Sequence, residues 1–217
     1  MKLLHIIASP RGQSNTLRIS SAFLETLSGA VPDLAIHEID LFNYNLPALA
    51  GDNIQAKYTL MMGQPIDKSH EASWRQIELL IADFLSADAY LVSSPMWNFS
   101  IPYALKYYID CIVQPGYLFQ YNELGHVVPL VNGKKMLCIT SRGSDYSALS
   151  PMHAYDFQEP YLRAIFGFVG ITALDFVNAE PMDMSPDWHA SATTSAIELA
   201  KSIAVRSDWT ADVTSAV

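Results

Sequence analysis

The chain has few basic residues for its size. Its 217 residues include 13 lysines and arginines against 22 aspartates and glutamates, which gives a formal net charge of -9 at pH 7. Nucleic-acid backbones and anionic membrane surfaces attract clusters of Lys and Arg, and such clusters are missing from this sequence. We therefore expect neither nucleic acid nor a membrane as the main partner.

Cysteine and long apolar runs are also scarce. The two cysteines, Cys111 and Cys138, lie inside apolar segments, which favours buried thiols over a disulfide or a metal pair and suits a reducing compartment. The apolar run after Met1 and Lys2 is too short for the core of a signal peptide, and no run reaches membrane-spanning length. These features predict a cytoplasmic protein.

The motifs of several enzyme classes are absent. The six histidines show no i,i+4 pair and no carboxylate at metal-ligand spacing, so no metal site is expected. Residues 133–135, Gly-Lys-Lys, lack the upstream glycine and the following Ser or Thr of a P-loop, and no Gly-x-Ser-x-Gly elbow indicates a hydrolase. Residues 29–35 likewise contain no dinucleotide-binding fingerprint.

Short apolar strands alternate with helices along the chain. We expect strands over residues 3–8, 34–40, 90–94, 136–140 and 172–179, and helices over 17–27, 71–86, 101–113, 155–168 and 188–205. Such a βα repeat predicts an α/β fold, a doubly wound parallel sheet with helices on both faces. We expect one domain over residues 1–217 with five strands in the flavodoxin-like order 2-1-3-4-5.

The loop over residues 9–16, Ser-Pro-Arg-Gly-Gln-Ser-Asn-Thr, joins the first strand to the first helix. Its hydroxyl and amide groups, its backbone N–H groups and the helix dipole together suit a phosphate. An ordinary turn in which Ser14 or Asn15 only caps the helix explains this loop equally well.

Two further loops follow the third and fourth strands, at the edge where ligands bind in this topology. Residues 95–99, Pro-Met-Trp-Asn-Phe, form an apolar ledge with one amide, which suits the edge of a flat heteroaromatic ring, although each aromatic alone could be a core or interface residue. In residues 141–144, Gly143 permits a close backbone approach. Jointly the three loops indicate one ligand with a ring and a phosphate.

At these residues the chain resembles the FMN-dependent NAD(P)H:quinone oxidoreductases that also reduce azo compounds, the azoreductases of the flavodoxin-like superfamily. The resemblance implies a homodimer with one FMN per subunit at the interface and NADH or NADPH as co-substrate. It also implies a ping-pong cycle in which hydride passes through flavin N5 to quinones and azo compounds. Its most specific elements are residues 95–99, 116–121 with Gly125, 133–135, 141–143, 160–162 and 167–171, within a match from residue 2 to about 180.

The resemblance further implies roles for individual residues. The phosphate cradle would comprise Ser9, Gln13, Ser14, Asn15 and Thr16, with Arg11 as a nearby charge. The residues that would pack on the flavin ring are Pro95, Met96, Trp97, Asn98 and Phe99, with Asn98 bonding the edge of the ring. At the pyrimidine side of the ring, where backbone donors stabilise negative charge, would lie Ser141, Arg142, Gly143 and Ser144. Phe119 and Tyr121 would shape the substrate pocket, often from the partner subunit, and Tyr121 is a candidate proton donor.

Some features depart from the family's pattern. Trp97 stands where a tyrosine is common, Ser144 and Asp145 replace the usual residues after the Arg-Gly pair, and the first loop is closer to that of general NAD(P)H-dependent FMN reductases. Residues 49–70, expected to be helical, and about 116–130 are predicted to be excursions that form part of the pocket or the dimer interface. A general FMN reductase, a flavodoxin-type electron carrier and a flavin-free interaction protein on the same scaffold stay open as alternatives.

Overall fold

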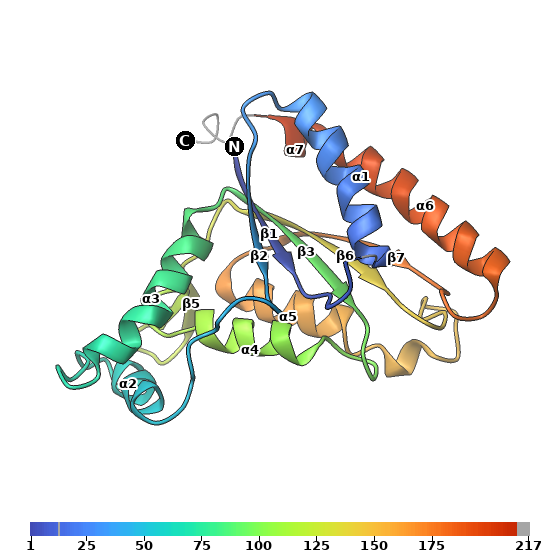
Figure 1. Cartoon of the computed structure of the whole chain (residues 1–217). Coiled ribbons are helices and arrows are strands. Elements are labelled where there is room, and N and C mark those ends of the chain that lie inside the picture. Colours follow the sequence, from blue (N-terminus) through green and yellow to red (C-terminus); the bar gives the residue numbers. More distant parts are fainter. Residues whose placement is uncertain (13, 212–217) are drawn as a thin grey trace.

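A five-stranded parallel sheet forms the centre of the molecule (Figure 1). The computed structural model describes residues 1–12 and 14–211. The sheet contains β1 (Lys2–Ile7), β2 (Ala35–Asp40), β3 (Ala89–Pro95), β6 (Lys135–Ser141) and β7 (Ala173–Ala179) in the order β2-β1-β3-β6-β7. Since β6 and β7 are the fourth and fifth strands of the sheet, the predicted order 2-1-3-4-5 is confirmed.

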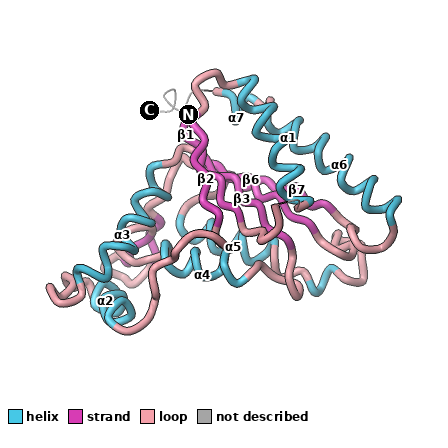
Figure 2. The backbone as a smooth tube through the Cα atoms, in the orientation of Figure 1, coloured by secondary structure: helices cyan, strands magenta, loops and turns pink. Residues whose placement is uncertain are grey.

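Helices cover both faces of this sheet (Figure 2). One face carries α1 (Asn15–Ala30), α6 (Pro186–Ala204) and the short α7 (Ser207–Thr210), and the other carries α3 (Glu71–Ser86), α4 (Tyr103–Ile112) and α5 (Glu159–Val169). Successive residues of a strand point to opposite faces, so Leu3 packs under α1 and α6 while Leu4 packs under the other helices. The central strands are therefore buried on both sides, which explains why their sequences read as continuous apolar runs.

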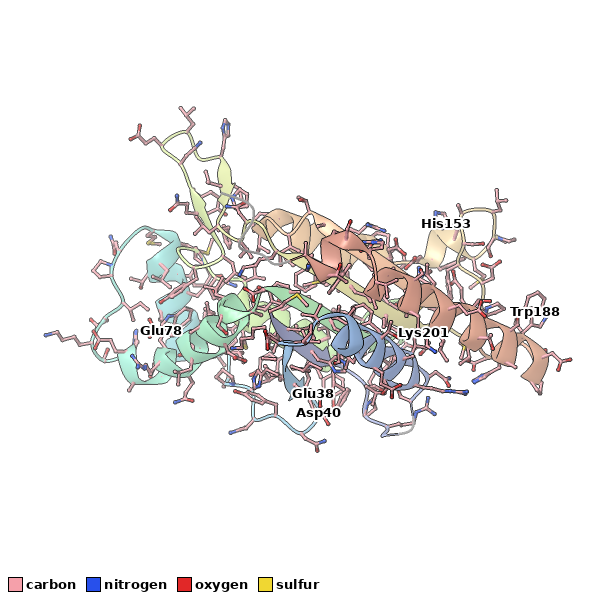
Figure 3. The ribbon with its side chains drawn as sticks, turned by 90° about the horizontal axis from the view of Figure 1, so that it is seen from above. Glu38, Asp40, Glu78, His153, Trp188 and Lys201 are labelled. Carbon is pink, nitrogen blue, oxygen red and sulfur yellow. The ribbon has the colours of Figure 1, made fainter. Side chains whose placement is uncertain are left out.

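Both expected excursions lie outside the two helical layers. Residues 49–70 contain α2 (Asp52–Met61), which confirms the predicted helix, and α2 packs beside α3. Residues 116–130 form a hairpin of β4 (Phe119–Tyr121) and β5 (Val127–Pro129), which sequence patterning did not identify as strands. Figure 3 shows this hairpin projecting from the body of the molecule.

One predicted helix begins later than expected. In place of a helix over 155–168, the chain forms a 3-10 turn at His153–Tyr155 and then breaks before α5. The carboxylate of Asp156 accepts the backbone N–H groups of Gln158 and Glu159, as a helix-capping side chain does. The helix therefore begins after Asp156, at Glu159. The N–H of Phe157 is meanwhile taken by the carbonyl of Phe99 on another loop.

The two cysteines are buried and unpaired, as the apolar context predicted. Burial raises the pKa of the Cys111 thiol to about 12. Among the described residues, no helix combines the length and the hydropathy that a membrane span needs.

Candidate functional site

The first loop ends in the capped N-terminus of α1. Ser14 adopts the N-cap conformation and its hydroxyl accepts the N–H of Leu17 at 3.2 Å, while its carbonyl accepts that of Arg18. Ser14 therefore does cap the helix. The backbone N–H groups of Asn15 and Thr16 have no acceptor inside the helix and stay open beside this cap. They lie at the positive end of the helix dipole.

A cavity of about 370 Å³ lies at this helix end. Its lining includes two residues that the sequence interpretation did not name, Arg18 and Ser21. The full lining is Gly12, Ser14, Asn15, Leu17, Arg18 and Ser21. The open amide of Asn15, a serine hydroxyl and a guanidinium around one cavity match the donor set that a phosphate monoester requires.

The remaining cradle candidates divide by exposure. Ser9 is buried at the end of β1, and Arg11 is exposed. Thr16 is fully buried, and its hydroxyl lies 2.6 Å from that of Ser14, so its side chain supports the cap from inside. The candidate Gln13 lies outside the described residues.

A chain of polar groups, buried except at Glu38, connects α1 to the sheet beneath the first loop. The hydroxyl of Ser20, one turn into α1, bonds to the carbonyl of Thr16 and to the hydroxyl of Ser93 on β3. Ser93 bonds to Nε2 of His5, and Nδ1 of His5 bonds to Glu38 on β2. This network was not anticipated, because it joins residues up to 88 positions apart in the sequence. It fixes α1 relative to the sheet at the level of the first loop.

The second loop contains a tight turn with unusual backbone geometry. Trp97 and Ser100 exchange both of their backbone hydrogen bonds, at 2.9 and 3.0 Å, and the two residues between them, Asn98 and Phe99, have φ values of 47° and 71°. Positive φ at both central positions defines a type I′ turn. Asn tolerates this region, but an aromatic residue there is strained, and strain of this kind concentrates at functional sites.

The turn presents aromatic rings and a free amide at the sheet edge. Trp97 packs against Phe42 and Tyr103, with ring centroids 5.7 and 6.2 Å apart, and Phe99 packs against Tyr155 at 5.3 Å. Both rings keep more than a third of their surface exposed. The side chain of Asn98 is exposed and bonds to no other described residue. The loop therefore offers a hydrogen-bonding amide beside flat apolar surfaces.

The third loop lies next to the second. The N–H of Met96 donates to the carbonyl of Ser141, which joins the two loops. The backbone N–H of Arg142 donates to the carbonyl of Ala179. The backbone N–H groups of Gly143 and Ser144 have no acceptor within the described part of the chain. A Cβ at Gly143 would lie 2.6 Å from a carboxylate oxygen of Asp183, so a larger residue here would make this exposed side chain shift.

The Arg142 side chain turns into the protein instead of toward the open edge. Only 1% of it is exposed, and its guanidinium donates to the Asp156 carboxylate at 3.0 Å and to Thr140 and Gln158. Gln158 in turn donates to the carbonyl of Pro95. Arg142 thus holds the second and third loops together, and any ligand contact in residues 141–144 falls to the backbone of the glycine and serine that follow it.

The predicted pocket aromatics lie apart from these three loops within one chain. Phe119 is buried against Phe168 on α5, at 4.8 Å between ring centroids, and against Tyr121 at 5.7 Å. Tyr121 is half-exposed on the hairpin. No aromatic contact joins either residue to Trp97 or Phe99 in the described chain.

Comparisons with known proteins agree with this architecture. A family model described as "Flavodoxin-like fold" matches residues 1–203. The FMN-dependent NADH:quinone oxidoreductase of Nitratidesulfovibrio vulgaris is 38% identical over 205 residues, covering 94% of this chain and 98% of the relative. The same-named protein of Nostoc punctiforme is 40% identical over 190 residues, covering 84% and 88%.

Solved structures are similar over the same length. The crystal structure of an azoreductase from Bacillus anthracis has 28% identity and a TM-score of 0.84, with 94% of this chain and 98% of that chain covered. An FMN-dependent NADH-azoreductase from the same species, solved in complex with FMN, has 27% identity and a TM-score of 0.80, with 94% and 99% covered.

Proposed function

The chain belongs to the family of FMN-dependent NADH:quinone oxidoreductases and azoreductases, and on this premise we propose that it oxidises NADH and reduces quinones and azo compounds. The observation that carries the proposal is the meeting of three loops with open hydrogen-bonding groups at one edge of the sheet. FMN, when bound, supplies the redox chemistry, because it accepts hydride from a nicotinamide and passes electrons to an acceptor.

The described residues fit FMN. The amide of Asn15 and the guanidinium of Arg18 would hold the phosphate in the cavity at the start of α1. The side-chain amide of Asn98 would bond the edge of the ring, and Trp97 and Phe99 would exclude water from one side of it. The open backbone amides of Gly143 and Ser144 would stabilise the negative charge that a reduced flavin acquires.

We also propose that the enzyme is a homodimer, as the family resemblance implies. Exposed aromatic side chains surround the second loop, among them Tyr103, Tyr155 and Phe157. A contiguous apolar surface of this kind is typical of an interface. Docking of a second copy would allow the hairpin residues Phe119 and Tyr121 of one subunit to close the site of the other. The buried thiols are compatible with the reducing cytoplasm, where we expect the protein to act.

The decisive experiment titrates the apo-protein with FMN and then measures NADH oxidation with a quinone and with an azo dye. We expect tight FMN binding and turnover of both acceptors. Double-reciprocal plots of the initial rate should give parallel lines, as a ping-pong cycle does. Failure to bind FMN would refute the flavin assignment and favour an interaction protein, whereas bound FMN without NADH oxidation would favour an electron carrier. Asn98→Gly should weaken FMN binding without lowering the melting temperature of the apo-protein, because Asn98 has no side-chain partner among the described residues and glycine tolerates the φ of 47° at this position.

The dimer is tested separately. Sedimentation should give about twice the chain mass of 24.0 kDa. An inactive cradle variant mixed with an inactive Tyr121 variant should regain activity if one subunit completes the site of the other. Verified subunit exchange without recovered activity would contradict the shared site.

A further inference from the structure

A second cavity lies immediately beyond the third loop. It measures about 430 Å³ and lies between residues 144–152 and the segment that leads into α6. Its lining combines two methionines, a proline and a tryptophan with three polar side chains. The lining residues are Ser144, Asp145, Ser150, Met152, Pro181, Met184 and Trp188. In Figure 3, Trp188 lies on the first turn of α6, at the same end of the molecule as His153.

The walls of this cavity are held in place by hydrogen bonds. The carbonyl of Gly143 accepts the N–H groups of Met182 and Asp183, which joins the third loop to the segment before α6. The imidazole of His153 bonds to the carbonyl of Tyr146 at 2.9 Å and that of His189 to the carbonyl of Met182 at 3.0 Å. The cavity is therefore formed before any ligand arrives, as small-molecule sites usually are.

The chemistry of the lining suits a nucleoside. The indole of Trp188 is half-exposed and the thioether of Met184 is more exposed still, so a flat aromatic group could stack on one and pack against the other. Asp145 supplies a carboxylate, which can accept the hydroxyl protons of a ribose. The lining contains no lysine or arginine, so no cation in it favours a phosphate group.

We propose that this cavity binds the adenosine half of NADH, with the adenine stacked on Trp188 and the ribose hydroxyls on Asp145. This inference rests on the proposed function, because the nicotinamide of the same molecule must reach the flavin. Ser144 belongs to both places: its backbone is in the proposed flavin-binding loop and it lines the cavity. One extended dinucleotide would therefore run from the flavin site directly into the cavity.

The charges around the cavity make it selective for NADH over NADPH. The N–H of Ser147 donates to the Asp145 carboxylate and lowers its pKa, so this group is ionised at neutral pH. A carboxylate beside the ribose binds its 2′-hydroxyl but repels a 2′-phosphate, which other proteins accommodate with an arginine. The nearest arginine of this loop, Arg142, is turned inward and paired with Asp156.

Reduced nicotinamide mononucleotide provides the sharpest test, because it carries the reacting ring but lacks the adenosine half. With the FMN-loaded enzyme, Trp188→Ala should lower kcat/KM for NADH about tenfold, the range expected for loss of one base-stacking aromatic. It should leave kcat/KM for the mononucleotide, the KM for quinone and the FMN affinity unchanged. Leu199→Ala, an exposed position on the same helix outside the cavity, is the matched control.

A binding measurement decides the inference without turnover. Calorimetric titration of the FMN-loaded protein with ADP-ribose, which lacks the nicotinamide, should show binding that Trp188→Ala abolishes and Met184→Ala weakens. Asp145→Asn keeps an acceptor for Ser147 and should raise the ratio of NADPH to NADH efficiency about fivefold, the effect of removing one nearby charge.

Several results would overturn the inference. An equal loss of efficiency with NADH and the mononucleotide would do so, and so would unchanged NADH kinetics or ADP-ribose binding that is absent or indifferent to Trp188. If the enzyme oxidises neither nicotinamide compound, the proposed function fails, and the ADP-ribose titration still decides whether the cavity binds adenosine.

Discussion

The strained turn after β3 predicts a difference in stability between two variants of Phe99, and backbone conformation alone decides which of the two is more stable. Phe99 has a φ of 71°, in the left-handed region that costs an ordinary residue about 1–2 kcal/mol and costs glycine almost nothing. Phe99→Ala and Phe99→Gly remove the same ring and its contact with Tyr155. The difference between the two variants therefore isolates the backbone term, and the glycine variant should be more stable by about 1 kcal/mol.

The opposite order is expected where the backbone is helical. Leu79 is half-exposed in α3, where glycine is about 0.5–1 kcal/mol less stable than alanine. Leu79→Ala and Leu79→Gly thus form a matched control pair. Equilibrium urea unfolding of the apo-protein, at one fixed protein concentration, measures all four variants against the parent chain.

The comparison can fail clearly. If Phe99→Ala equals or exceeds Phe99→Gly in stability while the Leu79 pair behaves as expected, the left-handed conformation at residue 99 is wrong. If the strain also pre-organises Asn98 toward the ring, Phe99→Gly should bind FMN more weakly than its stability suggests, because the freed backbone must be ordered again on binding.

Three further predictions concern stability. Arg142→Leu should cost about 3–5 kcal/mol in urea unfolding, because it leaves the buried carboxylate of Asp156 without its cation, and a loss below about 1 kcal/mol would contradict the buried pair. Gly170→Ala should cost more than about 2 kcal/mol, since φ there is 110° and the added Cβ would overlap a backbone carbonyl; a neutral result would show that this contact is wrong. The hydrogen bond from His5 lowers the pKa of Glu38, so the pair stabilises the fold above about pH 4.3 and this contribution is lost as the pH falls through the lowered pKa. Glu38→Gln should therefore be less stable than the parent at pH 7 and nearly equal to it at pH 3, and a difference that persists at pH 3 would point to another cause.

Much of the architecture follows from sequence patterning. Apolar runs such as the one that became β3 are buried on both faces, and the alternation with amphipathic helices leaves few topologies once crossovers are right-handed. The positions of the three site loops follow from the same pattern, because loops after parallel strands all emerge at one edge of the sheet. Local chemistry also predicts the cap at Ser14, since N-capping involves residues only three positions apart.

The direction of individual side chains was decided by the tertiary structure. Nothing near Arg142 in the sequence shows that it turns inward, because its partners Asp156 and Gln158 come from a segment that was expected to be helical. The same is true of the polar network under the first loop, which needs β1, β2, β3 and α1 in place, and of the cavity at Trp188, whose two walls are about forty residues apart. Periodicity records which face of an element is buried, and that is a local property. A hydrogen-bond partner or a cavity wall depends on which distant segments the folded chain brings together, and only the packed structure determines this.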